Sequence, residues 1–189
     1  MGRVIVNQFV SLDGIVTDPD GSAGTAAGGW AFQHGPGPVS GDKFRLGSIL
    51  ETGVMLYGRT TWELLGGLLS VRDDDFSVAM TKIAKIVVSS TLADVSGWNN
   101  SQLARQPITE LVPSETADRD VVVVGSLSIV RALQAADLVD EYRLMTFPTI
   151  VGSGEHLFDT AQQGDLELVS VDQVGPAVLT TYRRSEHRS

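Results

Sequence analysis

The chain has 189 residues, of which 42% are apolar and 20% charged, and it contains no cysteine. A chain of this length is expected to form one domain, residues 1–189, with a core that needs neither disulfides nor a metal. The lack of cysteine excludes a disulfide framework, a cysteine-ligated zinc site and a thiol nucleophile. It also favours a reducing compartment, so we expect a cytoplasmic protein.

The net charge is −9, from 14 basic and 23 acidic residues. An acidic protein repels a phosphate backbone, so nucleic acid is not an expected partner. Residues 1–10 do not resemble a signal peptide, and no stretch approaches the roughly 18 apolar residues of a membrane span. We therefore expect a soluble protein with a small-molecule partner and no membrane contact. An anionic ligand would have to be bound locally, by backbone amides and a few arginines.

The first predicted element is a buried strand over residues 3–10, which is short and rich in β-branched residues. A stretch rich in glycine and proline follows over residues 17–41. Loops of this length are mostly functional, so we expect a mobile lid with few apolar anchors that closes over a ligand. Ser40 or Asp42 is then expected to cap a helix. That helix would bury Phe44, Leu46, Ile49 and Leu50.

Strands and helices are predicted to alternate after this point. The predicted strands cover residues 53–57, 84–89, 120–124 and 141–150, and the predicted helices begin at residues 58, 107 and 126. The last of these helices runs to residue 137 with an apolar stripe of Leu127, Val130 and Leu133. Residues 166–174 and 177–183 flank Gly175–Pro176 and predict an antiparallel hairpin. The order predicts an α/β fold with a mixed, mostly parallel sheet covered on both faces.

Three turns follow predicted strands, and we interpret them as strand-to-helix turns. They are Gly58–Arg59–Thr60, Ser89–Ser90–Thr91 and Gly125–Ser126–Leu127. Ligands bind outside the carboxyl ends of parallel strands, where the amides of a helix N-terminus suit a phosphate. A single turn of this kind is most often an ordinary turn with no role in binding. Three of them at one sheet edge predict a site for a dinucleotide-sized anion. The Gly-x-Gly-x-x-Gly pattern of the standard Rossmann site is absent.

Two carboxylates are candidates for the substrate end of a site. Asp42 has the acceptor oxygens that the amino and ring N–H groups of a pterin or pyrimidine need, and its alternative role is the helix cap. Asp13 follows the first strand, and its alternative role is a turn residue before Gly14. The three histidines, His34, His156 and His187, show no metal-ligand spacing, so no metal site is expected.

Six motifs resemble, in order, those of a known family. They are Ser11–Gly14, Val54–Glu63, Val87–Ser90, Val121–Ser126, Leu138–Leu144 and Phe147–Gly154, the last ending at Leu157–Phe158. The chain resembles the dihydrofolate reductase superfamily, and within it the reductase domain of the bifunctional riboflavin-biosynthesis protein. The resemblance runs nearly end to end. It implies a three-layer α/β sandwich that binds NADPH and transfers a hydride to a pterin- or aminopyrimidine-like ring.

The same resemblance implies roles for individual residues. Cofactor phosphates would meet Arg59, Thr60, Ser89 and Ser90, while Gly58 and the turn Gly125, Ser126 and Leu127 approach the pyrophosphate and the nicotinamide ribose. Asp42 stands 17 residues before Arg59, the spacing of the substrate carboxylate in true folate reductases. The Ser-Leu-Asp-Gly signature instead indicates Asp13 at the substrate end. Trp30 and His34 in the lid, and Gly152 in the last motif, would complete the substrate site.

The expected activity is therefore that of a 5-amino-6-(5-phosphoribosylamino)uracil reductase-like enzyme, working as a homodimer. Asp42 or Asp13 would orient the ring and help to supply the proton. Leu127 departs from the family pattern, which often has glycine there, and it crowds the cofactor approach. Two alternatives remain. One is a genuine dihydrofolate reductase, against which Ser11–Gly14 argues, and the other is a nucleotide-binding protein without turnover.

Overall fold

The computed structural model describes residues 1–158 and 164–185. Within them the strands are β1 (Val4–Ser11), β2 (Val54–Gly58), β3 (Ala84–Val88), β4 (Ser101–Ala104), β5 (Val121–Val124), β6 (Glu141–Phe147), β7 (Leu166–Val174) and β8 (Ala177–Arg184). The α-helices are α1 (Ile49–Thr52), α2 (Arg59–Leu69), α3 (Asp75–Lys82), α4 (Ile108–Thr116) and α5 (Leu127–Ala135). Two short 3₁₀ helices, η1 (Phe32–His34) and η2 (Gly37–Val39), lie between β1 and α1.

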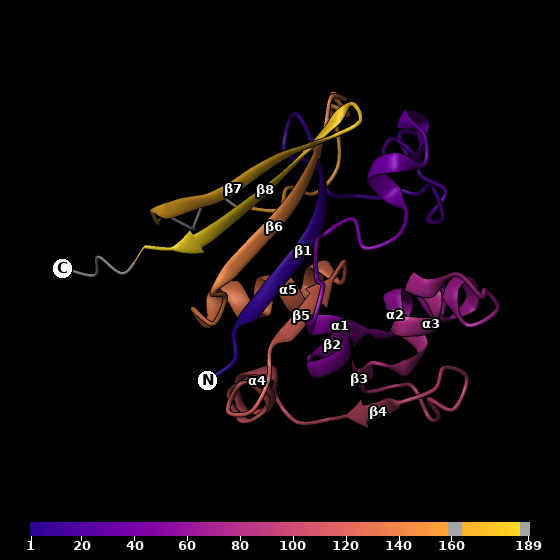
Figure 1. Ribbon diagram of the computed structural model, residues 1–189, viewed down its shortest axis with the longest axis vertical. Helices are drawn as coiled ribbons and strands as arrows, with labels where there is room; N and C mark the ends of the chain where they lie inside the picture. Colours follow the sequence, from indigo (N-terminus) through magenta and orange to yellow (C-terminus); the bar gives the residue numbers. More distant parts are fainter. Residues whose placement is uncertain (159–163, 186–189) are drawn as a thin grey trace. The chain divides into compact units, whose positions relative to one another are not determined.

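The strands form a mixed sheet in the order β4-β3-β2-β5-β1-β6-β8-β7 (Figure 1). Strand β2 pairs in parallel with β3 and with β5, and β3 pairs in parallel with β4. Strand β8 runs antiparallel to both β6 and β7. The two-residue turn between β7 and β8 places Gly175 at a φ of +60°, which glycine adopts without strain. The predicted α/β class and the C-terminal antiparallel hairpin are confirmed.

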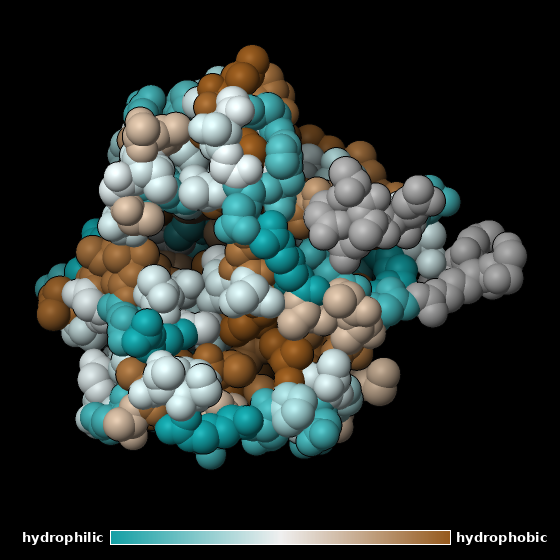
Figure 2. Space-filling view, turned by 180° about the vertical axis from the view of Figure 1, so that it is seen from behind, coloured by the Kyte–Doolittle hydropathy of each residue, from teal (hydrophilic) through white to brown (hydrophobic). Residues whose placement is uncertain are grey.

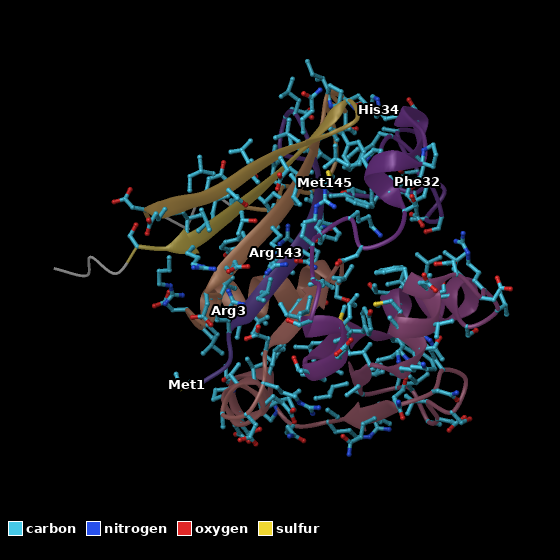
Figure 3. The ribbon with its side chains drawn as sticks, in the orientation of Figure 1. Met1, Arg3, Phe32, His34, Arg143 and Met145 are labelled. Carbon is cyan, nitrogen blue, oxygen red and sulfur yellow. The ribbon has the colours of Figure 1, made fainter. Side chains whose placement is uncertain are left out.

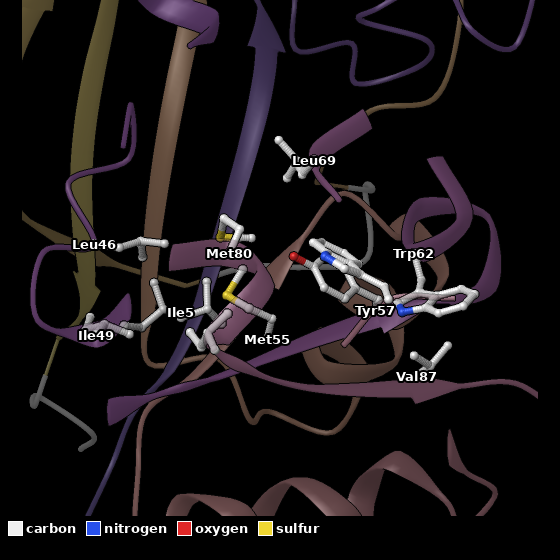
Figure 4. Packing of buried hydrophobic residues seen from close by; sticks show 12 residues of the cluster. Ile5, Leu46, Ile49, Met55, Tyr57, Trp62, Leu69, Met80 and Val87 are labelled. Carbon is white, nitrogen blue, oxygen red and sulfur yellow. The ribbon is translucent and has the colours of Figure 1, made fainter. Parts of the chain in front are cut away.

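The chain divides into two compact units, and β1 contributes to both. The first unit comprises residues 1–6 and 45–140. Its core gathers side chains of β2, α2 and α3 around Met55, Tyr57, Trp62 and Met80 (Figure 4). Met55 and Tyr57 share one face of β2 because successive strand residues alternate between faces. The Tyr57 ring stacks on Trp98 at 5.8 Å between centroids, and both rings are buried.

The second unit comprises residues 7–44 and 141–189. Its core is rich in aromatic side chains, with Trp30, Phe44 and Phe147 all buried and Phe9 packed at the border. Strand β7 is exposed along eight of its nine residues. Its exposed apolar side chains are Leu166, Leu168, Val169 and Val171. On the face that Figure 2 shows, apolar residues reach the surface in several patches among polar ones.

The glycine-rich stretch over residues 17–41 is anchored more firmly than the sequence predicts. Trp30 is 2% exposed, and its indole Nε1 donates to the Thr17 carbonyl oxygen at 2.8 Å. The carboxylate of Asp18 accepts hydrogen bonds from the amides of Ala23 and Thr25 and from the Thr25 hydroxyl. The expectation of few apolar anchors was wrong, because Trp30 is buried and packs on Phe147 of β6. The hydrogen bonds of the indole and of the Asp18 carboxylate lie within the stretch and hold its local conformation.

The helix predicted from Ser40 or Asp42 does not form there. Helix α1 begins only at Ile49, after Arg45 and Gly47 adopt left-handed φ values of 55° and 54°. The guanidinium of Arg143 also donates a hydrogen bond to the Phe44 carbonyl oxygen at 2.9 Å. This oxygen therefore accepts from a side chain, as in a non-helical segment. Asp42 is therefore not a helix cap, and the alternative role proposed for it is excluded.

Other predicted elements match the structure with limited differences. The sequence interpretation did not anticipate β4 or most of α3, and it extended β6 three residues too far, past Pro148, which cannot donate to a strand partner. In α5 the buried stripe is Ile129, Val130 and Leu133. Leu127, which was expected in that stripe, is only half-buried as the first residue of the helix.

Candidate functional site

Two helices of the first unit begin side by side at the carboxyl ends of neighbouring strands. Strands β2 and β5 pair in parallel, with Leu56 opposite Val123, so α2 and α5 start at the same sheet edge. The Gly58 amide donates to Ser126 Oγ at 2.8 Å. Ser126 in turn binds Thr61, its amide and its hydroxyl donating to Thr61 Oγ1 at 3.2 and 2.9 Å. These contacts bring together two of the three predicted turns.

The turn before α5 depends on an unusual backbone. Gly125 and Ser126 both lie in the left-handed region, with φ values of 62° and 47°. A Cβ at position 125 would stand 3.4 Å from the Thr61 side chain, so glycine is favoured by space as well as by φ. A left-handed serine costs about 1 kcal/mol, which the hydrogen bonds of its hydroxyl offset. Neither α2 nor α5 has a side-chain cap bond, so backbone amides dominate both helix starts.

Two arginines add positive charge at this edge. Arg59 and Thr60 open α2 and are exposed. Arg105, just after β4, is also exposed, and its guanidinium donates to the carbonyl oxygens of Ser89 and Leu92 at 2.8 and 2.7 Å. The sequence interpretation missed Arg105 because it did not recognise β4. Helix starts and arginines are the donors that the phosphates of a dinucleotide require, so these residues fit such a cofactor.

The Ser89 turn does not begin a helix, which corrects the prediction. Strand β3 lies beside β2, with Val88 opposite Gly58, so Ser89 does lie at the expected sheet edge. Its hydroxyl, however, accepts the Leu92 amide at 3.0 Å within a local turn that leads to β4. Ser90 is exposed. Of these two residues, Ser90 therefore has the more accessible side chain.

In the second unit, Asp13 holds a neighbouring segment in place. Its carboxylate accepts hydrogen bonds from the Ser11 hydroxyl at 2.6 Å and from the amides of Val151 and Gly152 at 3.1 and 2.7 Å. These bonds stabilise the ionised form, with the Ser11 hydroxyl contributing most, and lower the Asp13 pKa to about 2. Asp13 is therefore ionised at neutral pH and is not a proton donor there. Its contact with a substrate stays a prediction.

We expect the pH dependence of stability to report on Asp13. Because its pKa falls from 3.8 to about 2 on folding, its contribution is fully present above 3.8 and is lost as the pH falls towards 2. The difference in melting temperature between wild type and Asp13→Asn should be constant from neutral pH to about pH 5, and should shrink below pH 4. Asp172→Asn, on exposed β7, is the charge control. A difference that is independent of pH would contradict this role for the Asp13 bonds.

The remaining predicted substrate residues have different surroundings. Trp30 is buried in the core, where it anchors the 17–41 stretch, and its predicted contact with a substrate stays a prediction. His34, labelled in Figure 3, is half-buried. Its Nε2 lies 2.7 Å from Thr149 Oγ1. Gly152 is exposed and is held by Asp13 through its amide. Asp42 is half-buried in a bend of the chain, beside Lys43. His34, Gly152 and Asp42 remain candidates.

No group of three potential metal ligands occurs within residues 1–158 and 164–185. His187, one of the three histidines considered, lies outside the described residues. In the described part of the chain, none of the helices is both long and apolar enough to cross a bilayer.

Comparison with known proteins places this geometry in a family. The model of the RibD C-terminal domain matches residues 3–180, which covers both compact units. The chain belongs to the RibD C-terminal domain family. It is 27% identical over 185 residues to the uncharacterized protein YyaP of Bacillus subtilis, a match covering 94% of this chain and 92% of YyaP.

Solved structures of riboflavin-biosynthesis proteins share the fold of this RibD C-terminal domain. A putative riboflavin biosynthesis protein from Shewanella superposes with a TM-score of 0.72 at 22% identity, over 97% of this chain and 99% of that one. The deaminase/reductase of Thermotoga maritima gives 0.61 at 16% identity, and RibD of Acinetobacter baumannii gives 0.64 at 18%. The match covers 97% and 98% of this chain but only 57% and 58% of those two proteins. The predicted family, with its dihydrofolate reductase-like fold, is confirmed.

Proposed function

We propose that the protein is an NADPH-dependent reductase that transfers a hydride to a pterin- or aminopyrimidine-like ring. The observation that carries the proposal is the linked start of α2 and α5, where Gly58, Thr61 and Ser126 bind one another. Arg59 and Arg105 at the same edge supply positive charge in a chain whose net charge is −9. The protein of Thermotoga maritima with this fold is a diaminohydroxyphosphoribosylaminopyrimidine deaminase/5-amino-6-(5-phosphoribosylamino)uracil reductase, and a reductase activity of this type is the one that we propose here.

In this proposal the first unit binds the cofactor. The turns at Gly58–Thr60 and Gly125–Leu127 contribute backbone amides to the pyrophosphate, and Leu127 takes part through its amide because its side chain is half-buried. Arg59 and Arg105 pair with phosphate groups, and Ser90 supplies a hydroxyl. Bound NADPH supplies the hydride. Ser89 serves indirectly, by shaping the turn that presents Ser90.

In the second unit, Asp42 would accept hydrogen bonds from the amino and ring N–H groups of the substrate and so orient its ring. His34 and Gly152 would contact the same ring, and Asp13 would keep Gly152 in position through the bond at 2.7 Å. We also propose that the chain forms a single domain, assembles as a homodimer and is located in the cytoplasm.

The test is consumption of NADPH or NADH with a panel of pterins, aminouracils and dihydrofolate. We expect oxidation of NADPH with at least one aminouracil or pterin, and turnover lowered at least tenfold in Asp42→Asn. The cofactor affinity of that variant should stay within tenfold of wild type, because Asp42 belongs to the substrate half. Asp172→Asn is the control. Turnover of dihydrofolate alone would indicate a folate reductase, and cofactor binding without turnover of any ring would indicate a binding protein.

A further inference from the structure

A cluster of aromatic rings in the second unit is partly open to solvent. Phe9 of β1 stacks on Phe44 with 5.4 Å between ring centroids and an interplanar angle of 27°. Phe32 meets Phe9 edge-on at 6.4 Å, and it is 50% exposed. Phe9 itself is half-buried. Flat heterocycles bind well against such rings, so this cluster is a suitable platform for one.

Lys43 brings an ammonium group to this platform. Its Nζ lies 5.6 Å from the centroid of Phe9 and 5.8 Å from that of Phe44, within cation–π distance of both rings. Burial against these rings lowers the Lys43 pKa to about 8, and the neighbouring charge of Asp42 partly opposes the shift. An ammonium with this pKa is mostly protonated at neutral pH and releases its proton far more readily than an ordinary lysine.

The charged groups around Lys43 come from its own segment and from β6. Asp42 and Arg45 flank Lys43 and Phe44 in the chain. From β6, Arg143 donates to the Phe44 carbonyl oxygen and pairs with the buried Glu141 at 2.7 Å. Residues 7–11 of β1 carry no ionisable side chain. Glu141 also pairs with Arg183 of β8 at 2.9 Å, so its carboxylate is shared between two guanidinium groups. Asp42 is the group whose charge acts directly on Lys43.

Asn7 supplies an independent indication of a ligand on this face of β1. Asn7 and Phe9 lie on the same face because strand residues alternate. Asn7 is fully buried, and neither its Nδ2 nor its Oδ1 has a hydrogen-bond partner among the described residues. A buried amide without partners is costly, which indicates that a further group satisfies it. A ring that carries adjacent carbonyl and N–H groups has the complementary donor and acceptor.

We infer that Lys43 is the catalytic acid of the proposed reduction, protonating a ring that lies against Phe9 and Phe32. The hydride adds to the carbon of the C=N bond, and the electron pair of that bond moves to the nitrogen. The nitrogen takes a proton from the Lys43 ammonium, so a C–H and an N–H bond form while the cofactor is oxidised. Water then returns a proton to the Lys43 amine. This inference rests on the proposed function and supplies the proton that ionised Asp13 cannot donate.

The first test needs no turnover. The chain has three lysines, Lys43, Lys82 and Lys85, so ¹³C-labelled lysine gives three signals that Lys→Arg variants assign. We expect Lys43 to titrate near pH 8, and its signal to move when 5,6-diaminouracil or pterin is added. Lys85 is the internal control for the added ring: burial also lowers its pKa to about 8, but its ammonium donates to three main-chain carbonyl oxygens and its signal should not move. A Lys43 midpoint above 10, or no response to either ring, would overturn the inference.

The second test uses single-turnover reduction with saturating NADPH. Lys43→Met should slow ring reduction at least 100-fold while NADPH affinity stays within twofold, since general acids contribute about 10²–10⁴-fold. Lys43→Arg, which keeps the charge but is too weak an acid to donate a proton, should be nearly as slow, and the wild-type rate should fall above pH 8. Lys82→Met is the matched control. Unchanged rates in Lys43→Met would overturn the inference and leave the reductase proposal standing. If wild type reduces no ring, the proposed function fails and the lysine titration alone decides the role of Lys43.

Discussion

Replacing Trp30 by alanine is expected to lower the free energy of unfolding by about 3–5 kcal/mol, the usual loss for a buried aromatic side chain. Trp30 is 2% exposed, packs edge-on against Phe147 at 5.7 Å and donates its indole N–H to the Thr17 carbonyl oxygen. The loss combines an internal cavity with an unpaired carbonyl oxygen at the start of the 17–41 stretch. Urea denaturation followed by circular dichroism measures it.

Two further variants sharpen this test. Trp30→Phe keeps most of the packing and removes only the hydrogen bond, so it should lose less than Trp30→Ala. Val171→Ala, on exposed β7, should change stability by less than about 0.5 kcal/mol. Hydrogen exchange at the amides of Ala23 and Thr25, which Asp18 binds, should be slow in wild type. Fast exchange there, with no loss of stability in Trp30→Ala, would restore the interpretation of this stretch as an unanchored lid.

Replacing Arg59 by alanine is expected to weaken NADPH binding by about 1.5–3 kcal/mol, the range for hydrogen bonds to charged groups, or about 10- to 150-fold in Kd. Arg59 is exposed at the start of α2, beside the contact between Gly58 and Ser126. Removal of its charge leaves the backbone amides of α2 and α5 in place, so binding should weaken without being abolished. Titration calorimetry at fixed ionic strength measures the change.

Arg72→Ala is the matched control, because Arg72 belongs to the same unit, is exposed and pairs with Asp74 instead of opening a helix. Its NADPH affinity should equal that of wild type. The loss in Arg59→Ala should shrink at high salt, since an exposed charge is screened. Equal NADPH affinities in Arg59→Ala and wild type would remove Arg59 from the cofactor site.

Much of the candidate cofactor site could be predicted from local sequence patterns. Short β-branched runs such as 121–124 predict buried strands, and a glycine after such a run predicts a turn at the sheet edge. Because parallel neighbours end at the same edge, the sequence indicated that the Gly58 and Gly125 turns lie close together. It did not reveal that Thr61, and not Thr60, connects them. That contact depends on how α2 is rotated about its axis relative to the Gly125 turn, and no local sequence pattern indicates this rotation.

The substrate half depended much more on contacts distant in sequence. The Asp13 carboxylate accepts hydrogen bonds from the amides of Val151 and Gly152, which lie 138 and 139 residues away. These bonds hold the two segments together and help to lower the pKa of Asp13. Trp30 and Asp42 lie in segments with little periodicity, so no local pattern indicated that Trp30 is buried or that Asp42 does not cap a helix. The sequence did not indicate Lys43 as a candidate, because its environment forms only when Phe9 and Phe44 stack on each other beside its ammonium group.

The sequence by itself determined the positions of most strands along the chain, the parallel character of the first unit, the C-terminal hairpin and the family. These features follow from hydrophobic periodicity and turn residues, which act over a few neighbouring positions. Only the tertiary structure decided which polar groups are satisfied, which carboxylate is held ionised and which lysine is desolvated. Such properties depend on the distance between groups far apart in the chain and on how much water remains around them, and both are established only when the elements pack.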